Sequence, residues 1–163
     1  MGNILSTGER CYSGLAASGG VVLGKILRLG PRQVEVRERK ITAAEVEPEM
    51  CRLREALLNT RQQIREIQRR VSAALGAKEA AIFDAHVLVL DDPTLIEEVT
   101  RSIQVGLLGA ESAVHSAASR FSAALEAVQD PFLRERSVDV RDVTQRLMLN
   151  LEGGPSADLG HLT

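Results

Sequence analysis

The feature that most constrains the fold is a long stripe of core-type side chains between residues 46 and 71. They recur at alternating steps of four and three, the spacing that brings side chains to one face of an α-helix. The stripe consists of Val46, Met50, Leu53, Leu57, Thr60, Ile64, Ile67 and Val71. A helix from residue 47 to 74 would be about 40 Å long, and it needs another helix along its stripe to be stable in water. This pattern predicts a helical bundle.

Local signals mark where the helices begin and end. Thr42 and Glu45 have the spacing of a capping box, and Gly76 is expected to end the long helix. Aspartate followed by proline is typical of a helix start, because aspartate caps the helix and proline fits its first turn. This dipeptide occurs at residues 92–93 and 130–131. Further helices are therefore expected over about residues 80–90, 93–103, 110–128 and 131–151.

The N-terminal part of the chain follows another pattern. Glycine and other small residues at positions 14–20 favour a loop, and the short apolar runs at 21–23, 26–29 and 34–36 suit strands. We therefore expect a flexible leader at 1–13, a β segment at 14–40, a helical domain at 41–152 and a tail at 153–163. The predicted fold class is mainly α, with a helical hairpin or four-helix-type bundle.

Composition excludes several classes of function. The 20 Lys and Arg residues against 22 Asp and Glu leave a net charge of −2, which argues against a basic nucleic-acid-binding face. The sequence contains neither an apolar run of about 18 residues nor a signal-peptide stretch, so we expect a cytoplasmic protein without a membrane span. Cys11 and Cys51 have no companion ligand at metal-binding spacing and are interpreted as reduced thiols.

No catalytic constellation can be assembled from the sequence. The histidines, His86, His115 and His161, lack a nucleophile or carboxylate motif around them. We therefore predict no catalytic, cofactor-binding or metal-binding residue in this chain.

The run from residue 80 to 90 is apolar on nearly all sides. A helix that is covered by the protein on one face only would not need so many apolar residues. Ile82, His86 and Val89 are spaced four and three apart and form a candidate exposed stripe, a feature that often marks an interface. The alternative for His86 is a core histidine with a single hydrogen bond.

Charged residues crowd positions 133–142. Arg136, held by Asp139 or Glu135, would be well placed to anchor a partner's backbone or carboxylate. The alternative for this segment is a solvated helix face, since exposed ion pairs contribute little to stability.

Three blocks of sequence support a specific resemblance. They are residues 14–25, 81–93 and 133–143, which read GLAASGGVVLGK, AIFDAHVLVLDDP and LRERSVDVRDV, in that order. With them the chain resembles the N-terminal part of Enzyme I, the phosphoenolpyruvate-protein phosphotransferase of the bacterial sugar phosphotransferase system. The resemblance covers residues 14 to about 152.

The resemblance implies both a fold and a partner. The N-terminal strands would belong to an incomplete α/β phosphohistidine domain, and the helical domain would bind the small phosphocarrier HPr. The phosphoacceptor histidine, the Mg²⁺-dependent phosphoenolpyruvate barrel and the family's dimerisation region are expected outside this chain, since His161 lacks the glycine motif before it. The implied partner-binding residues are Ile82, Phe83, His86, Leu88, Val89 and Arg136.

The chain departs from the family pattern in places. Gly19 stands where proline is common, and residues 77–79 are less acidic than in some members, which affects the steering of a basic partner. Two functions remain open: a phosphotransfer component that docks HPr, or a non-catalytic helical interaction module or degenerate fragment. The gene sequence beyond Thr163, with or without the phosphohistidine motif, would separate them.

Overall fold

The computed structural model describes residues 3–4, 10–11, 19–21, 23 and 38–153, and the chain divides into two units, Met1–Arg32 and Gln33–Thr163. In the first unit, β1 (Asn3–Ile4) pairs antiparallel with β2 (Arg10–Cys11). The expected leader at 1–13 thus contains a strand pair that the sequence pattern did not indicate. The β segment expected at 14–40 and the tail expected at 153–163 lie almost entirely outside the described residues.

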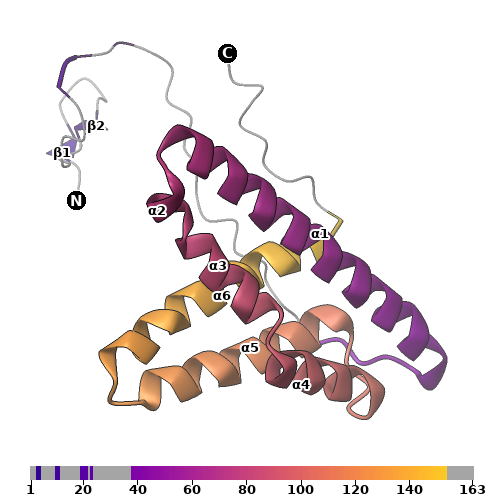
Figure 1. Ribbon diagram of the computed structural model, residues 1–163. Coiled ribbons are helices and arrows are strands. Elements are labelled where there is room, and N and C mark those ends of the chain that lie inside the picture. Colours follow the sequence, from indigo (N-terminus) through magenta and orange to yellow (C-terminus); the bar gives the residue numbers. More distant parts are fainter. Residues whose placement is uncertain (1–2, 5–9, 12–18, 22, 24–37, 154–163) are drawn as a thin grey trace. The chain divides into compact units, whose positions relative to one another are not determined.

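The second unit is helical in its described part (Figure 1). A 3₁₀ turn, η1, leads into six helices, of which α2 is a single turn. The elements are η1 (Ala43–Glu45), α1 (Val46–Ala74), α2 (Ala77–Ala80), α3 (Ile82–Leu90), α4 (Pro93–Gln104), α5 (Ala110–Ala127) and α6 (Pro131–Leu151). The predicted mainly helical class is confirmed.

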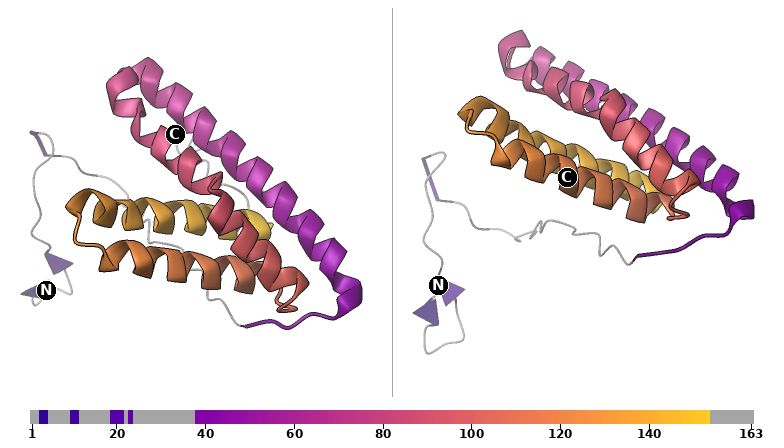
Figure 2. Two further views of the ribbon diagram at one scale, coloured as in Figure 1. Left: turned by 60° about the horizontal axis from the view of Figure 1, so that its bottom comes forward. Right: turned by 90° about the horizontal axis from the view of Figure 1, so that it is seen from below.

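Two antiparallel arms make up this helical unit. Figure 2 shows α5 beside α6 in one arm, and α1 beside α2, α3 and α4 in the other. The arms meet through contacts of α1 and α3 with α6 and of α4 with α5. The stripe on α1 therefore has the helical partners that its length requires.

The predicted helix ends agree closely with the structure. Gly76 follows α1 with φ 117°, a conformation that glycine adopts at no steric cost. The Asp92 side chain accepts hydrogen bonds of 2.8 and 3.1 Å from the backbone N–H groups of the second and third residues of α4. Thr42 donates to Glu45 Oε2 from its backbone nitrogen at 2.8 Å and from its hydroxyl at 2.7 Å. One expectation is corrected: the helix predicted over 80–90 is interrupted at Ala81, which separates α2 from α3.

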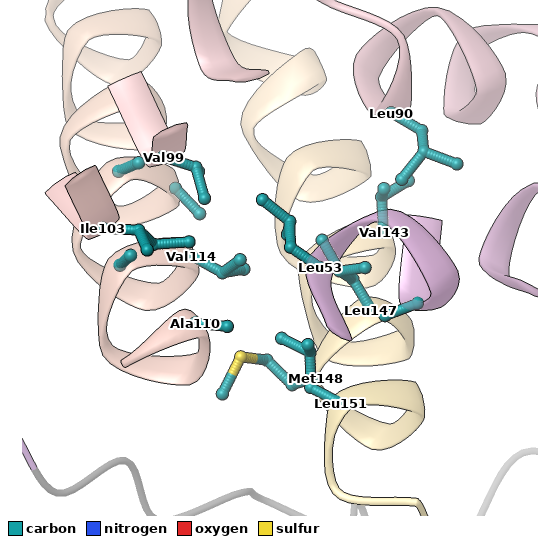
Figure 3. Packing of buried hydrophobic residues seen from close by; sticks show 14 of the residues in the cluster. Leu53, Leu90, Val99, Ile103, Ala110, Val114, Val143, Leu147, Met148 and Leu151 are labelled. Atoms are coloured by element: carbon teal, nitrogen blue, oxygen red, sulfur yellow. The ribbon is translucent and has the colours of Figure 1, made fainter. Parts of the chain in front are cut away.

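The hydrophobic core lies where the two arms meet. Figure 3 shows that side chains from α1, α3, α4, α5 and α6 point toward one another there. The labelled residues are Leu53, Leu90, Val99, Ile103, Ala110, Val114, Val143, Leu147, Met148 and Leu151. Thr60 is fully buried among them, with its hydroxyl donating to Ala56 O at 2.7 Å and accepting from Asn150 Nδ2 at 2.8 Å. The one polar member of the α1 stripe is therefore satisfied.

A buried carboxylate joins the start of the helical unit to its last two helices. Glu49, which is 6% exposed, accepts from Ala110 N at 2.8 Å, Arg39 Nη2 at 2.7 Å and Arg52 Nη1 at 2.8 Å. Arg52 also donates to Leu151 O at 2.9 Å. We call this set, completed by an ion pair from Arg52 to Glu111, the Glu49 network.

The Glu49 network sets the charge state of its own carboxylate. Burial by itself raises the pKa of Glu49, but the hydrogen bonds from Ala110, Arg39 and Arg52 outweigh it, so the pKa lies below the usual glutamate value. The carboxylate is therefore charged at neutral pH. It also lies at the first residue of α5, where a helix favours negative charge.

Candidate docking surface

The helix that carries most of the predicted partner-binding residues, α3, lies against both α1 and α6 (Figure 1). Polar contacts attach it to α1: Gln68 Nε2 donates to Asp84 Oδ1 at 2.7 Å, and Arg61 forms an ion pair with Asp91 at the end of α3. With both neighbours in place, α3 has only its outer side left for a partner.

Two apolar side chains of α3 remain in contact with solvent. Ile82, at its first turn, is 54% exposed, and Leu88, near its end, is 68% exposed. Large aliphatic groups left in water at this level are candidates for a partner contact, because burying each one is worth about 1.5 to 3 kcal/mol.

His86 lies below this outer side, with a side chain only 14% exposed. Its ring meets Phe83 edge to face, with centroids 5.6 Å apart and planes at 84°. Its Nε2 lies 3.3 Å from Asp139 Oδ1 on α6, which suits an ion pair when the imidazole is protonated. Within the described part of the chain this nitrogen has no hydrogen-bond partner. His86 therefore links α3 to α6 more than it faces solvent.

Arg136 belongs to the same cluster. Its Nη1 lies 3.7 Å from Asp139 Oδ2, and its side chain is 32% exposed. The contact between Arg136 and Asp139 that the sequence indicated is thus present. Asp139 also lies close to His86, which the sequence did not indicate. Asp139 brings together residues from α3 and α6 and holds the guanidinium at the edge of the outer side of α3.

The structure corrects the predicted exposed stripe at Val89. This residue is 9% exposed and belongs to the hydrophobic core, whereas Ile82 on the same side of α3 is exposed. The prediction assumed that one side of the helix is covered evenly along its length. Instead, the C-terminal end of α3 enters the core and its N-terminal end does not.

A groove between α1 and α3 was missed by sequence reasoning. It has a volume of about 690 Å³ and is lined by Arg65, Gln68, Arg69, Asp84, Val87 and Leu88. The spacing of Arg65 and Arg69 by four residues shows that they share a face of α1, but only the packing of α3 against α1 makes that face one wall of a groove. Leu88 thus lies beside a basic wall.

Other kinds of site are not found in the described residues. Over residues 38–153 and the short described segments before them, no group of three or more His, Cys, Asp and Glu side chains is arranged to hold a metal ion. None of the helices described is both long enough and apolar enough to cross a bilayer. An apolar surface edged by an arginine is suited to binding a protein.

Comparison with known proteins gives a consistent result. Residues 13–136 match the family model described as "PEP-utilising enzyme, N-terminal". The chain is 37% identical over 153 residues to a phosphoenolpyruvate-protein phosphotransferase of Geobacillus stearothermophilus. The matched region covers 94% of this chain and 26% of that protein. It is 33% identical over 140 residues to the Bacillus subtilis protein of the same name, and this match covers 86% of this chain and 24% of the Bacillus subtilis protein. The chain thus spans about a quarter of the length of these relatives.

Two solved structures are also similar. An NMR solution structure of Enzyme I (nEIt) superposes with a TM-score of 0.73 at 35% identity, covering 80% of this chain and 52% of the other. The structure of the N-terminal domain of Enzyme 1 - Nitrogen superposes with a TM-score of 0.66 at 28% identity, covering 75% of this chain and 50% of the other.

Proposed function

Because this chain belongs to the N-terminal domain family of phosphoenolpyruvate-utilising enzymes and is homologous to the N-terminal domain of Enzyme I, we propose that it docks an HPr-type phosphocarrier protein. In this proposal it is the N-terminal part of a cytoplasmic phosphoenolpyruvate-protein phosphotransferase that passes a phosphoryl group to the carrier during sugar uptake. The Mg²⁺ requirement that the resemblance implies for a complete enzyme of this family stays a prediction.

The observation that carries the proposal is the outer side of α3. Ile82 and Leu88 are exposed on a helix that is otherwise packed on α1 and α6, and Arg136 of α6 pairs with Asp139, which also faces His86 of α3. Phe83 and Val89 support this surface from below, since Phe83 packs against the core and Val89 belongs to it. The proposed docking surface therefore combines exposed apolar side chains of α3 with an arginine of the neighbouring helix α6.

A small surface of this kind suits a carrier that must dock and leave. We expect micromolar affinity, about −8 kcal/mol, because transient interfaces are small and rich in polar contacts. Truncation or charging of a central residue should cost on the order of 2 kcal/mol, about a 30-fold loss of affinity.

The test is an NMR titration of isotope-labelled chain with unlabelled HPr. Shifts are expected for residues 80–95 and around Arg136, and Leu88→Glu should weaken binding about 30-fold. Leu58→Glu is the matched control, since Leu58 is 61% exposed on α1 and lines neither the outer side of α3 nor its groove. This control should bind as the unchanged chain does.

Two results would contradict the proposed site. Shifts confined to residues 110–128, with none on α3 or near Arg136, would move docking to α5. The absence of any shift at concentrations well above micromolar would favour a helical interaction module that does not serve phosphotransfer.

A further inference from the structure

A second groove lies between α1 and α6 and reaches α3 at one end. It has a volume of about 550 Å³, within the range of about 300 to 1,000 Å³ typical of small-molecule sites. Its walls carry apolar side chains, among them Ile67 on α1, Phe83 on α3 and Leu149 on α6, together with polar ones such as His86, Gln145 and Asp142. Arg146 of α6 lines the same groove. The groove thus combines a hydrophobic interior with a cation.

Arg146 differs from the other partly buried arginines of the helical unit. Arg52 and Arg39 each form ion pairs with two carboxylates, Glu49 and Glu111. Arg146, by contrast, forms no ion pair with any carboxylate among residues 38–153. A guanidinium in such a groove loses part of its hydration, and no ion pair with a carboxylate of residues 38–153 replaces it.

The pKa of Arg146 reflects the same lack of an ion-pair partner. Burial lowers the pKa of Arg146 from the ordinary arginine value, and the negative charge of Asp142, one turn earlier on α6, offsets this only in part. The group remains cationic at neutral pH, because arginine titrates far above it. An anion that entered the groove would therefore meet a partly desolvated cation that has no carboxylate partner among residues 38–153.

Two of the amide side chains that line the groove, those of Gln63 and Asn150, are already paired with each other. Gln63 Nε2 donates to Asn150 Oδ1 at 2.9 Å, and Asn150 Nδ2 donates back to Gln63 Oε1 at 3.1 Å. Asn150 also donates to the buried Thr60 hydroxyl at 2.8 Å. These amide groups are therefore occupied, and Arg146 is the arginine that lines the groove.

We propose that this groove binds a small organic monocarboxylate, whose carboxylate pairs with Arg146 and whose apolar body lies against Ile67, Phe83 and Leu149. A planar guanidinium matches a carboxylate through two parallel hydrogen bonds. Asp142 lines the groove as well and would repel a doubly charged phosphate more than a single carboxylate. The groove shares Phe83 and His86 with the predicted partner-binding residues, but its ligand is recognised through Arg146, so the proposal does not depend on HPr binding.

Hexanoate is a suitable probe, because it has one carboxylate and a short apolar body. Titrated into the isotope-labelled chain, it should shift the groove residues saturably in the millimolar range, as expected for a ligand of this size. Hexanol, which lacks the charge, and inorganic phosphate, which lacks the apolar body, should each bind at least about tenfold more weakly.

Substitutions separate a site at Arg146 from nonspecific binding. Arg146→Gln should weaken the binding of hexanoate at least about tenfold. Arg146→Lys keeps the charge but loses the bidentate geometry, so its affinity for hexanoate should lie between those of the unchanged chain and Arg146→Gln. Arg65→Gln is the control, because Arg65 lines the other groove. The NMR spectrum of each variant reports whether it is folded. If Arg146→Gln does not fold, Arg146→Lys is used for the test instead. Linear, unsaturable shifts, equal binding of hexanol, or unchanged binding by a folded Arg146 variant would overturn the proposal.

Discussion

Replacing Glu49 with glutamine tests the network that joins the start of the helical unit to α5 and α6. The carboxylate is 6% exposed and accepts from Ala110 N, Arg39 and Arg52 at 2.7 to 2.8 Å. Glutamine has nearly the same shape, but it keeps one acceptor oxygen and turns the other into a donor. At least one N–H group around position 49 would then face another donor, and both arginines would lose their charged partner there.

The expected cost follows from the contacts. Hydrogen bonds to a charged group contribute about 1.5 to 3 kcal/mol, and breaking a fully buried ion pair from one side costs about 3 to 5 kcal/mol. The side chains of Arg39 and Arg52 are 44% and 39% exposed, so water can hydrate them after the change. We therefore expect Glu49→Gln to lower the free energy of unfolding by about 2 to 3 kcal/mol.

The same prediction has a pH dependence of known sign. Because the pKa of Glu49 lies below its usual value, its stabilisation is fully present above the ordinary glutamate pKa of about 4.3. It is lost as the pH falls through the lowered pKa of the folded state. The unchanged chain and Glu49→Gln should therefore differ most at neutral pH and approach the same stability in acid.

Urea unfolding followed by circular dichroism measures both effects. Glu55→Gln is the control on the same helix, since Glu55 is exposed and should change stability by no more than about 0.5 kcal/mol. The reasoning is refuted if Glu49→Gln costs no more than this control at neutral pH. A difference between Glu49→Gln and the unchanged chain that stays constant down to acid pH would also contradict it.

Three further changes test other parts of the fold. Ile103→Ala should cost about 3 to 4 kcal/mol in urea unfolding, because Ile103 is 0% exposed in the core; a cost below about 1 kcal/mol would contradict this packing. Asp92→Ala removes the cap of α4 and should cost about 1 kcal/mol in the same assay; no loss would show that the cap is dispensable. In Gly109→Ala the new Cβ would lie 2.8 Å from the Arg39 guanidinium and should displace it from Glu49, costing about 1 kcal/mol. That cost should shrink in the Glu49→Gln background, and strict additivity in this double-mutant cycle would exclude the coupling.

The candidate docking surface was predictable only in part. Ile82 and Leu88 are exposed as expected of interface residues, and Arg136 contacts Asp139 as its helical spacing indicated. Val89 is buried although it shares the side of α3 with Ile82, and His86 is largely covered. Periodicity reports which residues share a side of a helix, but it does not report how far along that side a neighbouring helix extends.

The sequence by itself determined the helices and most of their ends. The stripe on α1, the glycine at position 76, the Thr42–Glu45 pair and the Asp92 cap are interactions within one or two turns, so spacing along the chain is enough to identify them. Such signals do not depend on how the helices are arranged in space.

Only the tertiary structure decided which helices share polar groups. Glu49 and Ala110 are separated by 61 positions, and His86 meets Asp139 across two helices. The groove around Arg146 likewise depends on the packing of α1, α3 and α6, because residues of all three helices line it. Contacts of this kind depend on the angle and register at which two helices pack, and no residue spacing within a single helix encodes that geometry.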